Sequence, residues 1–93
     1  MAVTLRIPSY LATFADGRSS FALEGTPATV SDALKSLWDL HPGLRDRIVD
    51  EQGEVRQHIN IFVGEEAIRF ADGLLTKVPK DAEIMIVPAV SGG

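Results

Sequence analysis

The sequence predicts an α+β fold in which a mixed sheet of about five strands wraps around one main helix. Three observations support this prediction. One segment has the apolar periodicity of an amphipathic helix, and short segments of alternating apolar residues stand both before and after it. The length of 93 residues suits one domain with a single modest core. Because one helix cannot cover both faces of a sheet, we expect it to lie against one face only.

Two strands are expected before the helix. Residues 3–7 alternate apolar and polar side chains, and Pro8 then interrupts the pattern because proline cannot donate to a ladder. The apolar residues up to position 14 follow no clear period. Asp16-Gly17 is a strong turn pair, and residues 20–24 alternate again. The opening segment therefore predicts an antiparallel hairpin.

The main helix is the clearest element. Thr29 is its expected N-cap, and Asp32 in the first turn approximates a capping box and favours the positive end of the helix dipole. Apolar residues at helical spacing form one stripe, which assigns Trp38 to the core: Val30, Ala33, Leu34, Leu37 and Trp38. His41-Pro42-Gly43 ends the helix because proline cannot continue it.

Shorter elements follow the helix. A helical turn is expected at residues 44–49 and a polar loop at 50–54. Alternation predicts a third strand at 59–63, a short strand or extended arm at 67–70, a helical turn near 74–78 and a last strand at 83–87.

The resulting order is strand, strand, helix, strand, short strand, strand. A mixed sheet with a crossover through the helix satisfies this order, and that arrangement is the ubiquitin-like β-grasp fold. We expect a β-grasp domain over residues 1–88 and a flexible C-terminal tail over 89–93 that finishes on Gly-Gly.

Composition excludes several function classes. Apolar residues make up 45% of the chain and charged residues 24%, which is typical of a globular protein. The net charge is −4 and the basic residues are scattered, which disfavours nucleic-acid binding. No cysteine is present, so disulfides and thiolate chemistry are excluded. Neither a signal peptide nor a membrane span is visible, so a cytoplasmic protein is expected.

Conventional catalytic motifs are missing from the sequence. The only histidines are His41 and His58, and neither has the spacing of a metal site. No Gly-x-Ser-x-Gly elbow and no glycine-rich phosphate loop occurs. We therefore expect a protein that is not an enzyme and binds no metal or cofactor of its own.

The terminal sequence IVPAVSGG is the most informative motif. Two terminal glycines occur by chance in about one sequence in 200. Gly92 and Gly93 lack Cβ atoms, so such an end can thread a narrow channel. Its α-carboxylate is ionised at neutral pH and resists nucleophiles until it is activated, for example by adenylation. A cloning artefact or a frayed end would not explain why this tail follows the last strand so closely.

This tail, together with the β-grasp order, resembles the ThiS/MoaD superfamily of ubiquitin-like sulfur carriers over essentially the whole chain. Four segments look most like the CysO-type carrier of cysteine biosynthesis: Asn60-Ile61-Phe62-Val63, Ile68-Arg69-Phe70, Asp72-Gly73-Leu74 and Pro88-Ala89-Val90-Ser91-Gly92-Gly93. Ala89 stands where molybdopterin-type carriers tend to have a second proline. This difference makes a molybdopterin-type carrier the less favoured interpretation.

The resemblance implies a protein co-substrate. An ATP-dependent enzyme of the ThiF/MoeB class would adenylate Gly93, and a sulfurtransferase or sulfide would convert it to a thiocarboxylate. A pyridoxal-phosphate cysteine synthase would then place the sulfur on an activated serine, and a metallopeptidase would release cysteine. Related carriers serve thiamine, molybdopterin or sulfur-containing natural products. ATP and pyridoxal phosphate belong to the partners in each case.

Partner docking would need an exposed surface near the tail. Phe62, Met85 and Val87 alternate away from the expected core, and they either form a docking patch or lie under residues 71–80 or the segment after Pro8. Arg69 either meets an acidic partner or is an ordinary surface arginine. The reacting end of the candidate site is Gly92 and Gly93. Its partner-binding positions are Phe62, Arg69, Met85, Val87, Pro88, Ala89, Val90 and Ser91.

Two other functions remain open at this point. A ubiquitin-like modifier would pass the same adenylate to lysines of other proteins. A plain β-grasp interaction module would bind through its sheet and be indifferent to the last two residues.

Overall fold

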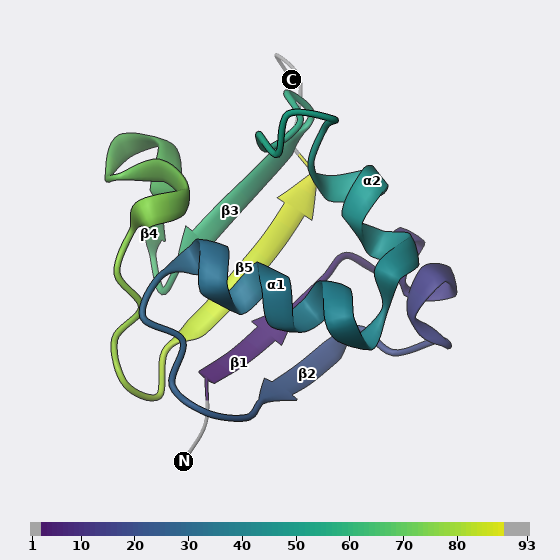
Figure 1. Ribbon diagram of the computed structural model, residues 1–93, viewed down its shortest axis with the longest axis horizontal. Coiled ribbons are helices and arrows are strands. Elements are labelled where there is room, and N and C mark those ends of the chain that lie inside the picture. The colour runs from purple at the N-terminus through teal and green to yellow at the C-terminus, as the bar shows by residue number, and fades with distance from the viewer. Residues whose placement is uncertain (1–2, 89–93) are drawn as a thin grey trace.

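A computed structural model describes residues 3–88 and places five strands in one sheet, with the main helix packed across one face (Figure 1). The strand order is β2-β1-β5-β3-β4, where β1 and β5 are parallel and the other neighbours are antiparallel. The strands have these bounds: β1 Val3–Arg6, β2 Ser20–Leu23, β3 Ile59–Val63, β4 Glu66–Ala67 and β5 Glu83–Pro88. This confirms the predicted mixed sheet around one helix.

The main helix α1 spans Val30–Leu40 and begins as the sequence predicts. The backbone N–H of Asp32 donates to the Thr29 side-chain oxygen at 3.2 Å, which satisfies one donor of the first turn. The helix ends at Leu40, and the backbone N–H of the C-cap residue His41 donates to the Leu37 carbonyl. The His41 ring packs against Phe21, with the ring centroids 5.3 Å apart.

The core lies between α1 and the sheet. Val30, Ala33, Leu34 and Leu37 of α1 are buried, whereas Trp38 is only partly buried and packs at the edge of the core. Alternate strand residues face the helix, and all of them are buried: Val3, Leu5, Phe21, Leu23, Ile59, Ile61, Ile84 and Ile86. Burying one such side chain contributes about 1.5–3 kcal/mol, so this layer dominates the stability of the fold.

The predicted antiparallel pairing of β1 and β2 is confirmed, but the connection between them is longer than a tight turn. The two strands are antiparallel, but a 3-10 helix, η1, occupies Ser9–Ala15 between them. Asp16 and Gly17 have positive φ angles of 55° and 83°, as expected of turn residues, and they end η1. Leu11 and Ala15 are buried, so η1 places two more apolar side chains in the core.

The segments after α1 follow the prediction with one correction. A 3-10 turn, η2 (Pro42–Leu44), leads into the short helix α2 (Arg45–Ile48). The short strand or extended arm predicted at 67–70 is wrong in its bounds, because β4 covers only Glu66–Ala67 and Ile68–Phe70 form a 3-10 turn, η3. This turn buries Ile68, and it is followed by another turn, η4, at Gly73–Leu75. No helix among residues 3–88 is long and apolar enough to cross a membrane.

Candidate functional site

The last strand, β5, carries the chain from the core to the candidate reactive tail. Ile84 and Ile86 point under α1 and are buried, whereas Met85 and Val87 point to the opposite face of the sheet and are half-buried. Pro88 ends the strand, is exposed and stands opposite Ile59 of β3. Ala89, Val90, Ser91, Gly92 and Gly93 lie outside the described residues.

The strand register brings apolar residues of three strands together on the outer sheet face. Phe62 stands opposite Met85 on one side and opposite Ala67 on the other, and Val87 follows Met85 on the same face of β5. These four residues, which we call the outer-face patch, are all half-buried. The alternation predicts that Phe62, Met85 and Val87 face away from the core, and the strand register brings them together.

Neither residues 71–80 nor the segment after Pro8 covers the outer-face patch. Within residues 71–80, the backbone of Thr76 and Val78 bonds to Val30 and Ala28, which places this segment beside the start of α1. The 3-10 helix η1 that follows Pro8 packs against η2. Both segments therefore lie on the helix side of the sheet (Figure 1), whereas the burial pattern of β5 places the outer-face patch on the opposite face.

An ion pair that the sequence did not predict borders the outer-face patch. The Nε atom of Arg6 lies 2.7 Å from the Glu83 carboxylate, and Arg6 is the β1 neighbour of Met85. Both side chains are about half exposed, so the pair contributes at most about 1 kcal/mol to stability. The sequence places both residues on outward-facing positions, but their contact depends on the parallel register of β1 and β5.

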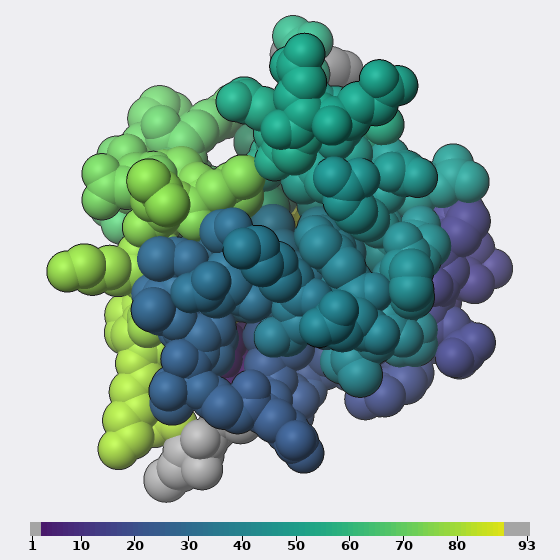
Figure 2. Space-filling model, in the orientation of Figure 1, coloured from purple at the N-terminus to yellow at the C-terminus, as the bar shows by residue number. Residues whose placement is uncertain are grey.

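Arg69 lies on η3, at the opposite edge of the sheet from β2. Its side chain is exposed, and the guanidinium carbon lies 5.2 Å from the centre of the Phe70 ring. It lines a groove of about 470 Å³ that the sequence did not predict. This β3-edge groove lies between residues 54–61 and residues 67–74, and the surface is hollowed between these two segments (Figure 2).

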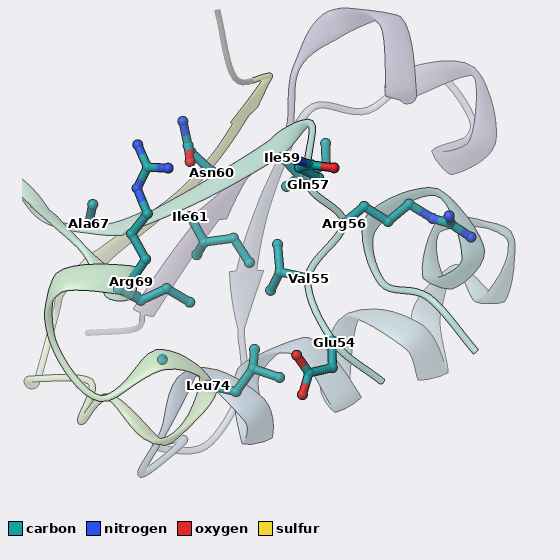
Figure 3. A pocket seen from close by; sticks show the side chains of 12 residues that line it. Glu54, Val55, Arg56, Gln57, Ile59, Asn60, Ile61, Ala67, Arg69 and Leu74 are labelled. Atoms are coloured by element: carbon teal, nitrogen blue, oxygen red, sulfur yellow. The ribbon is translucent and has the colours of Figure 1, made fainter. Parts of the chain in front are cut away.

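The β3-edge groove has an apolar interior and charged rims. Val55, Ile61 and Leu74 point into it, Arg69 stands on the rim formed by η3, and Glu54 lies on the opposite rim (Figure 3). Arg56 extends away from the groove, and its Nε donates to the backbone carbonyl of Asp46 at 2.8 Å. Among residues 3–88, no group of three or more His, Cys, Asp or Glu side chains could hold a metal ion.

Comparisons with known proteins agree on one family. The ThiS family matches residues 5–93. The sulfur carrier protein CysO of Mycobacterium tuberculosis is 32% identical over the whole of both chains.

Two solved structures extend the likeness to the fold. The structure of the Amycolatopsis orientalis BexX/CysO complex contains a chain that is 36% identical, with a TM-score of 0.86 over 99% of this chain and 100% of that one. SAMP1 of Haloferax volcanii is 31% identical, with a TM-score of 0.79 over the whole of both chains. These likenesses confirm the ubiquitin-like β-grasp fold.

Proposed function

The chain belongs to the ThiS family and is a CysO-like sulfur carrier, and from this premise we propose that Gly93 is the residue that carries the sulfur. In this proposal residues 1–88 form the β-grasp domain that partners recognise, and residues 89–93 form the reactive tail. The observation that supports it is the full-length similarity to CysO, together with the Gly-Gly end.

The chemistry must begin with activation of the Gly93 carboxylate. A carboxylate is a poor electrophile because it is ionised at neutral pH and its negative charge repels a nucleophile. A carboxylate oxygen attacks the α-phosphorus of ATP, pyrophosphate leaves, and an acyl adenylate forms. Sulfide then displaces AMP and leaves a thiocarboxylate. Alternatively, the outer sulfur of a sulfurtransferase persulfide displaces AMP to give an acyl disulfide, and a thiol reduces that bond, which releases the thiocarboxylate and leaves the thiol in a disulfide with the sulfurtransferase cysteine. An activating enzyme of the ThiF/MoeB class supplies the nucleotide site.

We propose that the activating enzyme holds the domain through the outer-face patch. Two of its half-buried apolar residues, Met85 and Val87, lie on the strand that leads into residues 89–93, so a partner that binds the patch also contacts the strand from which the tail leaves the domain. Burial of Phe62 and Met85 would supply apolar contact area. Polar contacts to the Arg6–Glu83 pair beside them would orient the carrier on the enzyme. Pro88, Ala89, Val90 and Ser91 would pass through the channel that leads to the nucleotide.

The sulfur acceptor is proposed from the CysO likeness. A pyridoxal-phosphate cysteine synthase would accept sulfur from the Gly93 thiocarboxylate to make cysteine. Thiamine, molybdopterin and sulfur-containing natural products are the other destinations within the family. The similarity to a CysO chain in a complex with BexX supports a function in which the carrier is held by a partner protein.

Intact-mass measurement tests the proposal directly. The full chain is incubated with ATP, sulfide and a purified activating enzyme of the ThiF/MoeB class, and the expected product is heavier by the exchange of one oxygen for sulfur. The control is the chain that lacks Gly93, which must keep its fold by circular dichroism and gain no mass. A chain without Gly93 that still gains sulfur would refute the assignment, as would no gain with several enzymes that are active on their own carriers.

The likeness to SAMP1, whose name denotes a small archaeal modifier, fits a ubiquitin-like modifier but does not favour it over the carrier. The two functions differ in the fate of the adenylate. A modifier gives covalent conjugates that survive denaturing electrophoresis and depend on Gly93. A carrier gives the mass increase of the thiocarboxylate and no conjugates.

A further inference from the structure

The edge of β3 is only partly paired, and this edge forms one side of the β3-edge groove. The short strand β4 pairs with Phe62 and Val63 only. The preceding residues 59–61 of β3 pair with β5 on one side and face the groove on the other. A sheet edge of this kind presents backbone donors and acceptors that can pair with another chain.

The register identifies the backbone groups that face the groove. Gly64 N–H donates to the Glu83 carbonyl at 2.8 Å, so alternate residues from Gly64 back to Asn60 bond to β5. The residues between them, Ile59 and Ile61, direct their backbone groups away from β5. Ile59 N–H donates to the Arg56 carbonyl at 2.9 Å. The Ile59 carbonyl and the Ile61 N–H are therefore left facing the groove.

These two groups select the direction of a guest strand. They flank Asn60. In a guest strand that runs parallel to β3, a single residue can donate its N–H to the Ile59 carbonyl and accept a hydrogen bond from Ile61 N–H. An antiparallel guest needs both groups of a single residue. Ile59 N–H is already used, so Ile59 cannot form such a pair, and the Phe62–Ala67 pair lies directly beside Ile61 on the other side. The two free groups therefore favour the parallel direction.

The charges on the two rims define the ends of such a guest. Along the direction of β3, Glu54 stands on the rim beside Val55, near the beginning of the exposed edge, whereas Arg69 stands at the β4 end, and the apolar interior lies between them (Figure 3). A guest that runs parallel to β3 would bring a basic group near Glu54 first and a carboxylate near Arg69 last. Arg69 forms no ion pair within residues 3–88.

We propose that the β3-edge groove binds an extended apolar segment of a partner protein, parallel to β3, with a basic residue before it and a carboxylate after it. The two turns that form one wall also expose Phe70 at 78% and Leu75 at 72%, which are apolar anchors that a partner would cover. The groove shares Ala67 with the outer-face patch, but the backbone groups of Ile59 and Ile61 lie outside that patch and the Gly93 chemistry is not involved, so the test is independent of the proposed function.

A peptide titration of the isotopically labelled full chain tests the binding mode. The probe is an end-capped peptide with the order lysine, valine, isoleucine, valine, glutamate, and its control has the reversed order. We expect saturable binding of the probe, a shift and slowed hydrogen exchange of the Ile61 amide, and binding of the reversed peptide at least about tenfold weaker. A second probe, with glutamine and a free C-terminus, shows whether a side chain or a chain end supplies the carboxylate.

Two perturbations separate this mode from loose apolar contact. Arg69→Glu should weaken binding of the probe at least about tenfold, and exchanging the glutamate of the probe for lysine should restore binding to this variant. Lys80→Glu, which makes the same charge change in a distant turn, should have no effect. N-methylation of the central isoleucine removes its donor to the Ile59 carbonyl and should abolish binding, whereas N-methylation of the next residue should be tolerated.

Several results would overturn the proposal. They are the absence of saturable binding, equal binding of the reversed peptide, equal tolerance of both N-methylated peptides, and amide shifts confined to the outer-face patch. Concentration-dependent self-association that Arg69→Glu abolishes would show that a second copy of the chain occupies the groove, and it would overturn the proposal of a partner segment.

Discussion

Met85→Glu tests whether the outer-face patch is the surface that an activating enzyme holds. Met85 is half-buried on the face opposite the core, so a glutamate there can reach solvent, and its neighbour Arg6 is already paired with Glu83. We expect the fold to persist, with a loss of about 1 kcal/mol or less in the free energy of unfolding, because the helix side of β5 is untouched. That loss corresponds to a decrease of about 4–8 °C in Tm.

The effect on activation should be much larger than the effect on stability. Complete burial of a methionine contributes about 1.5–3 kcal/mol, so covering the remaining half of Met85 contributes about 1 kcal/mol. Placing an unpaired carboxylate in the contact costs about 2 kcal/mol more. The sum of about 3 kcal/mol predicts a decrease of roughly a hundredfold in kcat/KM for thiocarboxylate formation.

The assay is the rate of sulfur incorporation, followed by intact mass at carrier concentrations below KM. Ala22→Glu is the matched control, because Ala22 lies on the same outer face but is exposed on the edge strand β2 and changes the charge by the same amount. It should react at the rate of the original chain. Equal rates for the two variants, with both folded, would refute the reasoning that the outer-face patch is the docking surface.

Three further predictions concern stability and are checked by chemical denaturation. Ile86→Ala should cost about 2–5 kcal/mol, because Ile86 is buried between β5 and α1, and a loss below about 1 kcal/mol would contradict this placement. Thr29→Ala should cost about 1 kcal/mol through loss of the cap bond to Asp32, whereas Thr29→Ser should cost little. Arg6→Ala should cost under about 1 kcal/mol and lose its effect in about 1 M salt, since the pair with Glu83 is half exposed; a salt-independent loss would indicate apolar packing instead.

Much of the fold follows from local periodicity. The helix stripe, its Thr29 cap and the alternation in β1, β2, β3 and β5 all appear in the structure within a residue or two of the predicted bounds. These elements are predictable because each buries one face, and burial imposes a period of two or 3.6 on the sequence. The same alternation correctly separates Met85 and Val87 from Ile84 and Ile86.

The irregular segments were not predictable in this way. Residues 9–15 have apolar content without a strand or helix period. They form a 3-10 helix because this conformation buries Leu11 and Ala15 in the core. The segment expected to be a short strand or extended arm at 67–70 turns after Ala67, which buries Ile68 instead of continuing the ladder. In both places tertiary packing, which no local window contains, decides the backbone conformation.

The sequence by itself determined the helix, the four main strands, the residues that face away from the core and the Gly-Gly motif, because each depends on residue type and short-range spacing. Only the tertiary structure decided that Phe62, Ala67 and Met85 share one row, that Arg6 meets Glu83, and that the edge of β3 borders a groove. These features depend on strand order and register, which bring together residues that are far apart in the sequence. Side-chain periodicity alone does not specify which strand becomes the neighbour of another.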